Sequence, residues 1–190
     1  MSEMEQRNFG KLLAYHTAPT LLGIKCASLV SLSRTEYDVD EHSCYFNRRT
    51  AEKGLKSRVM CGCGGRVLLL IYKETLLEKR LSDSKVRRLL ERFGYGGSFT
   101  PEECLYRLSQ RIQEGGDFPH EIGIFLDYPV EDVVGFIRNK GNNYKLCGCW
   151  KVYGCEETAR KTFANYDKCR KYLCNKLNEG ADIYQALKIS

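Results

Sequence analysis

Two Cys-Gly-Cys motifs carry the residues most typical of metal chemistry, Cys61-Gly62-Cys63 and Cys147-Gly148-Cys149. In an extended segment, residues i and i+2 point to the same side. The first motif precedes one predicted strand and the second lies in or beside another. If those strands were neighbours, four thiolates could converge on a zinc ion or an iron–sulfur cluster. Metal knuckles usually place two residues between the cysteines, so the sequence favours simple burial of small, soft side chains.

His120 and Glu121 form the second candidate site. The pair begins like the zinc-peptidase helix, which requires a second histidine four positions after the first, but position 124 is isoleucine. A metallopeptidase is therefore excluded. Both residues follow Pro119 in a predicted first helical turn, where free N–H groups and the helix dipole favour an anion or a carboxylate. They are expected either to help hold an anion or simply to begin the helix.

Two further patterns are typical of nucleic-acid binding. Residues 121–140 resemble a helix-turn-helix. Its second helix would begin with Glu131 and Asp132, however, and their negative charges are unfavourable beside DNA phosphates. Residues 144–153 interleave aromatic rings with lysines, a pattern that a half-buried strand also produces. A plain helical hairpin and an ordinary strand are the favoured interpretations. Nucleic acid is not expected as a partner, and a nucleic-acid or regulatory adaptor stays an alternative function.

Composition is that of an ordinary globular chain. The 190 residues carry a net charge of +6 that is spread along the sequence, and they include ten cysteines. No apolar stretch approaches the roughly 18 residues that a membrane span requires. The N-terminus lacks a secretory pattern, so we expect a cytoplasmic protein with reduced thiols, as in an anaerobe.

Hydrophobic periodicity predicts a single domain over residues 1–190, of α/β or α+β class. Its small mixed sheet would be centred on a strand at about 67–72 and packed by several helices. Helices are expected at 4–15, 84–93, from 100 onward, 119–126, 129–139, 156–178 and from 181, and strands at 26–33, 67–72 and 145–153. Pro19 should end the first helix. Residues 34–43 should form an exposed loop.

Three segments together resemble a known family. They are Ala14 to Lys25 (AYHTAPTLLGIK), Phe118 to Leu126 (FPHEIGIFL) and Trp150 to Gly154 (WKVYG). With the Tyr128-Pro129 and Asp132-Val133 pairs, the chain resembles domain-of-unknown-function family 3793, cytosolic proteins of about this length from anaerobic Firmicutes. It departs from the family's pattern at Cys26, where proline is expected, and at Asp127, where glycine is expected. The resemblance implies no established activity.

The resemblance marks His16, Lys25, His120 and Glu121 as part of the family pattern. If the four meet, they form a small polar site within an apolar wall, as in a ligand pocket. The working hypothesis is binding, or enzymatic turnover, of a small anionic or redox ligand. His16 and His120 would act as acid, base or ligand nitrogens, Lys25 would hold negative charge, and Glu121 would orient a histidine. Tyr128 and Trp150 are expected to contact the ligand. The sequence predicts no particular cofactor or protein partner.

Overall fold

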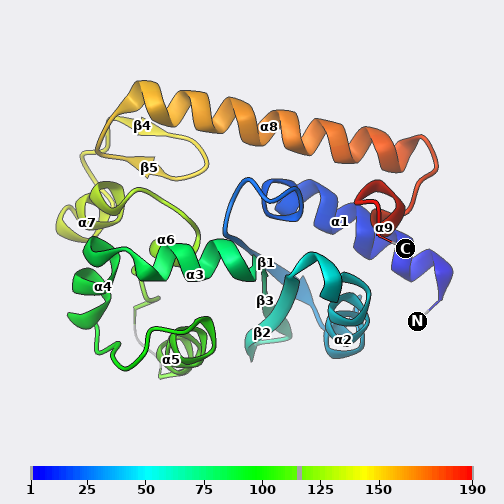
Figure 1. Ribbon diagram of the computed structural model, residues 1–190, viewed down its shortest axis with the longest axis horizontal. Helices are drawn as coiled ribbons and strands as arrows, with labels where there is room; N and C mark the ends of the chain where they lie inside the picture. Colours follow the sequence, from blue (N-terminus) through cyan, green and yellow to red (C-terminus); the bar gives the residue numbers. More distant parts are fainter. Residues whose placement is uncertain (1, 115–116, 190) are drawn as a thin grey trace. The chain divides into compact units, whose positions relative to one another are not determined.

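The computed structural model describes residues 2–114 and 117–189, which form two compact units (Figure 1). The first unit comprises Met1–Leu77 with Lys168–Ser190, and the second comprises Glu78–Asp167. Helices together with an antiparallel sheet confirm the α+β alternative of the predicted fold class. A single domain over the whole chain stays a prediction. No helix within the described ranges is both long enough and apolar enough to cross a membrane.

The first unit is built on a three-stranded sheet in the order β1-β3-β2. Its elements are α1 (Glu3–Leu21), β1 (Ala27–Ser33), α2 (Val39–Thr50), the 3₁₀ turn η1 (Ala51–Lys53), β2 (Leu55–Cys63), β3 (Arg66–Lys73) and α9 (Ile183–Ala186). Helices α3 (Glu74–Ser82) and α8 (Glu156–Asn178) contain residues of both units. The predicted central strand is confirmed as β3.

Both strand pairs of this sheet are antiparallel, so the expectation of a mixed sheet was wrong. The reason is the short connection between β2 and β3. Gly64 and Gly65 both have positive φ angles, of 58° and 79°. Two such residues form a tight hairpin turn, whereas a parallel pair needs a crossover of roughly a dozen residues or more.

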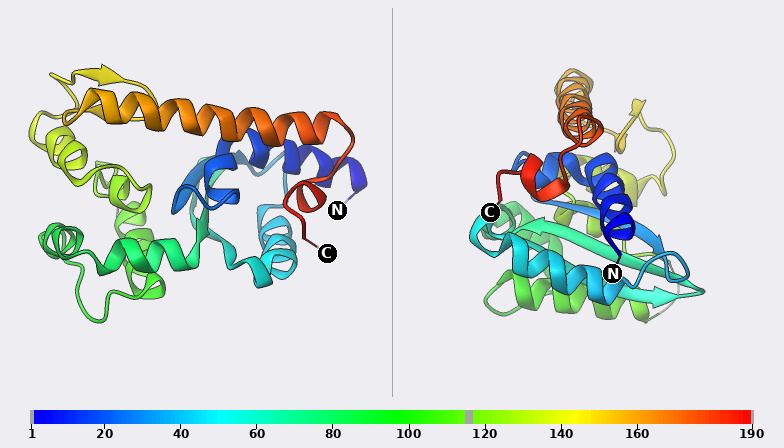
Figure 2. Two further views of the ribbon diagram at one scale, coloured as in Figure 1. Left: turned by 45° about the horizontal axis from the view of Figure 1, so that its top comes forward. Right: turned by 90° about the vertical axis from the view of Figure 1, so that its right-hand side faces the viewer.

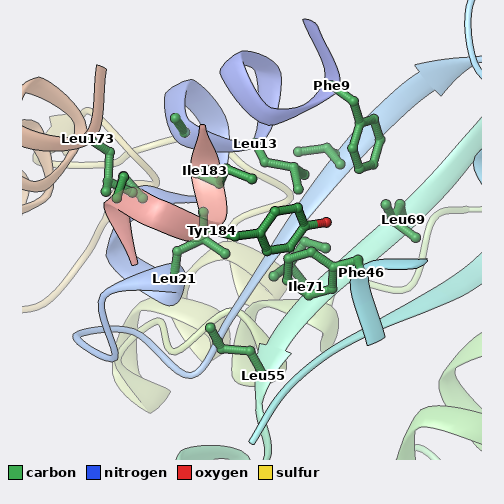
Figure 3. Close-up of a cluster of buried hydrophobic side chains, with 14 of the residues drawn as sticks. Phe9, Leu13, Leu21, Phe46, Leu55, Leu69, Ile71, Leu173, Ile183 and Tyr184 are labelled. Atoms are coloured by element: carbon green, nitrogen blue, oxygen red, sulfur yellow. The ribbon is translucent and has the colours of Figure 1, made fainter. Parts of the chain in front are cut away.

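The core of the first unit lies between helices and one face of the sheet. Figure 3 shows Leu13 of α1, Phe46 of α2 and Ile71 of β3 directed toward one another. Leu70 and Tyr72, which alternate with Ile71 along β3, are also buried. The strand is therefore buried on both faces, as its continuous apolar run predicted. Figure 2 also shows α1 beside α9.

Helix α1 continues through Pro19 to Leu21, so the predicted end of the helix before Pro19 was wrong. Proline has no N–H to donate to the carbonyl four residues earlier, that of Tyr15. Arg170 supplies the missing donor, because its Nε lies 3.1 Å from the Tyr15 carbonyl oxygen. Its guanidinium also lies 5.0 Å from the centre of the Tyr15 ring. A contact from α8 thus allows the proline inside the helix.

Residues 39–43 begin helix α2, so the exposed loop predicted over 34–43 was wrong for its second half. Asp38 caps the helix, its side chain accepting a hydrogen bond from the Glu41 N–H at 3.0 Å. His42, in the first turns, is only 2% exposed. Its ring stacks on Phe9 at 4.2 Å, and its Nε2 lies 3.0 Å from Glu5 Oε1. The polar segment therefore contributes to the core.

The second unit contains mainly helices and one small hairpin. Its elements are α4 (Ser84–Glu91), α5 (Pro101–Gln113), α6 (Ile122–Phe125), α7 (Val130–Arg138), β4 (Leu146–Cys147) and β5 (Lys151–Val152), with the first part of α8. These helices were all predicted near their observed positions. The strand predicted over 145–153 is instead the antiparallel pair β4–β5, with Gly148 between its strands. The hairpin lies beside the first turns of α8 (Figures 1 and 2).

Candidate functional site

A pocket of about 330 Å³ lies within the second unit. His120, which lies just before α6, lines the pocket together with Tyr128, Asp132 and Phe136 from the segment that follows. The β4–β5 hairpin contributes Cys147, Trp150 and Lys151. Four of these residues were predicted from the sequence as site residues: His120, Tyr128, Cys147 and Trp150. Asp132, Phe136 and Lys151 were not assigned to a site.

One wall of the pocket is a fixed aromatic cluster around Trp150, which is 8% exposed. Tyr128 stacks on the indole, with ring centres 5.0 Å apart and an interplanar angle of 25°. Phe163 of α8 meets the indole edge to face at 4.6 Å. Burial raises the pKa of Tyr128 to about 12, so its phenol is neutral at physiological pH. The wall therefore presents flat, uncharged ring surface.

Asp132 holds the hairpin against α7 and is only 3% exposed. Its Oδ2 accepts a hydrogen bond from Trp150 Nε1 at 2.7 Å. Its Oδ1 accepts from the backbone N–H groups of Tyr153 and Gly154, both at 2.7 Å. Three donors thus satisfy a buried carboxylate, as burial of a charge requires. The carboxylate fixes the orientation of the indole and does not need a cation from a ligand.

The remaining polar groups of the pocket can donate hydrogen bonds. His120 is exposed, its ring meets Phe136 edge to face at 4.9 Å, and its ring nitrogens have no hydrogen bond within the described ranges. Lys151 Nζ donates to the Gly141 carbonyl oxygen at 2.8 Å. An ammonium has three N–H donors and no acceptor. Lys151 can therefore bond one carbonyl and still present a donor and a positive charge.

The shape of the pocket depends on glycines in its lining. A Cβ atom on Gly123 would lie 2.8 Å from Val133 Cγ2 and 3.1 Å from Tyr128 Cδ2. A Cβ atom on Gly148 would lie 2.2 Å from Phe163 Cε2. Such distances are far below van der Waals contact, so only glycine fits these positions in the observed packing.

Helices α6 and α7 are the pair whose sequence resembles a helix-turn-helix. Asp132, at the start of the second helix, is buried against the hairpin. Gly135 also faces the hairpin, since a Cβ there would lie 2.4 Å from Tyr153 Cγ. This face of α7 is thus occupied by β5 and the residues after it. The adaptor alternative stays a prediction.

Glu121, the neighbour of His120, is 1% exposed and ion-paired to Arg111. The same oxygen, Oε1, accepts a hydrogen bond from the Tyr95 hydroxyl at 3.3 Å. Burial, followed by the Glu121 charge, raises the pKa of Tyr95. Among the described residues, the carboxylate's contacts are with Arg111 and Tyr95. A histidine-orienting role for Glu121 stays a prediction.

His16 and Lys25 belong to the first unit, whereas His120 and Glu121 belong to the second. His16 is exposed on α1, and its ring meets Tyr15 edge to face at 4.9 Å. Desolvation, and then the charge of Arg170, lower the pKa of His16. Lys25 is buried just after α1, where its backbone N–H donates to the Pro19 carbonyl oxygen at 3.1 Å. The meeting of the four residues stays a prediction.

The two Cys-Gly-Cys motifs also lie in different units. Cys61 and Cys63 precede β3 as expected, and they lie among the last residues of β2, a strand that was not predicted. The Cys63 side chain is outside the described part of the structure. Cys147 and Cys149 are exposed on either side of Gly148. Among the described side chains, no three or more of His, Cys, Asp and Glu are grouped so as to hold a metal ion. The thiolate-metal alternative stays a prediction.

Sequence comparison places the chain in a family. A family described as protein of unknown function (DUF3793) matches residues 13–187. The chain belongs to this family. The match includes the pocket residues of the second unit as well as His16 and Lys25 of the first. Searches of curated proteins and of solved structures find no match. Because DUF3793 has no described function, the geometry of the site must carry any functional argument.

Proposed function

We propose that this DUF3793 protein binds a small molecule with a flat apolar ring and an anionic group, in the pocket of the second unit. The observation that carries the proposal is the pairing of a buried aromatic wall, Tyr128 and Trp150, with two basic side chains, His120 and Lys151. The ring would lie against the wall, and the anion would accept hydrogen bonds from the basic groups. The proposed ligand is thus anionic, in agreement with the working hypothesis from the sequence.

The size of the pocket favours a ligand of one or two rings. Sites for small molecules typically occupy about 300–1,000 Å³, and this pocket, at about 330 Å³, is near the lower limit. Apolar walls with a few directed polar groups are typical of such sites. The Asp132 carboxylate also lines the pocket, and its oxygens are held by three N–H donors, so the anion is expected on the side of His120 and Lys151. A dinucleotide would not fit within the pocket.

Trp150 makes a direct test available, because it is the only tryptophan in the chain. Its fluorescence should be quenched saturably when the full-length protein is titrated with benzoate or phenyl phosphate. Benzyl alcohol, which has the same ring without a charge, is the matched probe. One charge-assisted hydrogen bond contributes about 1.5–3 kcal/mol, so the anions should bind roughly tenfold or more tightly than the alcohol.

Substitutions of the two basic residues test whether they bind the anionic group. Lys151→Gln and His120→Gln should each weaken benzoate binding severalfold and leave benzyl alcohol binding unchanged. Lys85→Gln, an exposed lysine on α4 outside the pocket lining, is the charge-matched control and should bind like the wild type. Equal affinity for benzoate and benzyl alcohol would refute the proposal. So would benzoate binding by Lys151→Gln and His120→Gln at the wild-type level.

A further inference from the structure

A second pocket, of about 280 Å³, lies within the first unit and is lined by three lysines. Lys53 ends the η1 turn, Lys73 ends β3, and Lys188 follows α9. The remaining lining is mostly apolar and includes Leu22 and Tyr172. Among the residues that the structure describes, no aspartate or glutamate lines this pocket. Three lysines therefore line one small concave surface, and its described lining residues include no carboxylate side chain.

In the described part of the chain, no acidic side chain is ion-paired to Lys73. Glu74, which follows Lys73 in the chain, forms its ion pair with Lys56. Lys73 itself donates to the Lys53 carbonyl oxygen. For Lys53 and Lys188, no ion pair exists within the described ranges. Like charges held close together repel, and the repulsion is relieved when an anion binds between them.

Capping of helix ends does not account for the lysines. Helices α1 and α9 both end beside this pocket, and lysines can bond the carbonyls of a last helical turn. Here backbone N–H groups already fill that role. The Pro19 carbonyl accepts from Ile24 and Lys25, and the Tyr184 carbonyl accepts from Leu187 and Ile189. The ammonium groups of Lys53 and Lys188 therefore stay available to a ligand.

We propose that this pocket is a binding site for a small phosphate monoester. The phosphate dianion would lie among Lys53, Lys73 and Lys188, and its apolar substituent would lie on Leu22 and the Tyr172 ring. Lysine binds phosphate as a point charge. Three ammonium groups are therefore expected to bind a phosphate dianion more tightly than a ligand with a single carboxylate group. The site is separate from the pocket that contains Trp150 and belongs to the other unit.

The test uses n-butyl phosphate, whose alkyl chain offers no ring to the aromatic wall around Trp150. Calorimetric titration of the full-length protein at low salt should detect saturable binding that weakens as salt is raised. Lys53→Gln and Lys188→Gln should each raise Kd at least tenfold. Lys11→Gln and Lys168→Gln remove the same charge from exposed positions of the first unit outside this pocket, and should bind like the wild type.

Three results would overturn the inference: no saturable binding, equal weakening in the control variants, or wild-type binding by Lys53→Gln and Lys188→Gln. The variant Lys151→Gln separates this site from the proposed ring-binding pocket. It should bind n-butyl phosphate normally while losing affinity for benzoate. Loss of n-butyl phosphate binding in Lys151→Gln alone would assign the anion to the other pocket and remove the lysine site.

Discussion

Replacing Asp132 by asparagine removes one acceptor from the most connected buried side chain of the candidate site. The carboxylate accepts from Trp150 Nε1 on one oxygen and from the N–H groups of Tyr153 and Gly154 on the other, all at 2.7 Å. Asparagine has one oxygen and one NH₂ group. If its oxygen keeps the two backbone donors, its NH₂ group faces the indole N–H, so two donors oppose each other.

The expected cost follows from those contacts. A buried donor left without a partner costs about 1–3 kcal/mol, and the two remaining hydrogen bonds lose their charge assistance. We therefore expect Asp132→Asn to lower the free energy of unfolding by about 2–4 kcal/mol. Urea unfolding followed by far-ultraviolet circular dichroism measures the change. The variant Trp150→Phe removes the opposing donor, so Asp132→Asn should cost about 1–2 kcal/mol less in that background. A change within ~0.5 kcal/mol of wild type, or no coupling to Trp150→Phe, would refute the role assigned to Asp132.

Two further perturbations test the packing of each unit. Gly148→Ala should destabilise the protein by about 1–3 kcal/mol in urea unfolding, because the new Cβ overlaps Phe163, whereas Gly96→Ala should be nearly neutral because open space surrounds that glycine. The hydrogen bond with His42 lowers the pKa of Glu5. The stabilisation that the ionised Glu5 carboxylate gives the folded protein is therefore complete above the ordinary carboxyl pKa of 4.5, and it is lost as pH falls through the lowered pKa. Thermal unfolding should therefore show Glu5→Gln less stable than wild type at neutral pH, with the difference shrinking below about pH 4.5; a constant difference would contradict this.

Local signals in the sequence predicted most of the helices, because apolar residues recur along one face of each helix and a capping residue or proline marks the start of several. Thr100 and Pro101 begin α5 as expected, with the Thr100 hydroxyl accepting from the Glu103 N–H. The same kind of signal was present before α2, where Asp38 is followed by Glu41. It was missed because the segment is strongly polar. His42 is buried only through contacts with α1, and no local pattern reveals such contacts.

The family motif at residue 127 has a physical explanation in the backbone. Asp127 has a positive φ of 64°, a conformation that glycine adopts without strain and that aspartate tolerates better than most residues. The turn between α6 and α7 requires this positive φ, and both the glycine of the family pattern and the aspartate of this chain can adopt it. The motif therefore reports backbone geometry here rather than a chemical role.

The candidate site was only partly predictable because its organising residue resembles an ordinary helix-start carboxylate. Acidic residues are common in the first turn of a helix, where the dipole favours them and water usually surrounds them. Asp132 occupies that turn of α7, yet its partners lie 18 to 22 residues later in the hairpin. Tyr128 and Trp150 lie in two separate family motifs, and no signal in the sequence joins them. The long-range bonds of Asp132 fix the indole in place, so the pocket depends on tertiary contacts that periodicity and spacing do not encode.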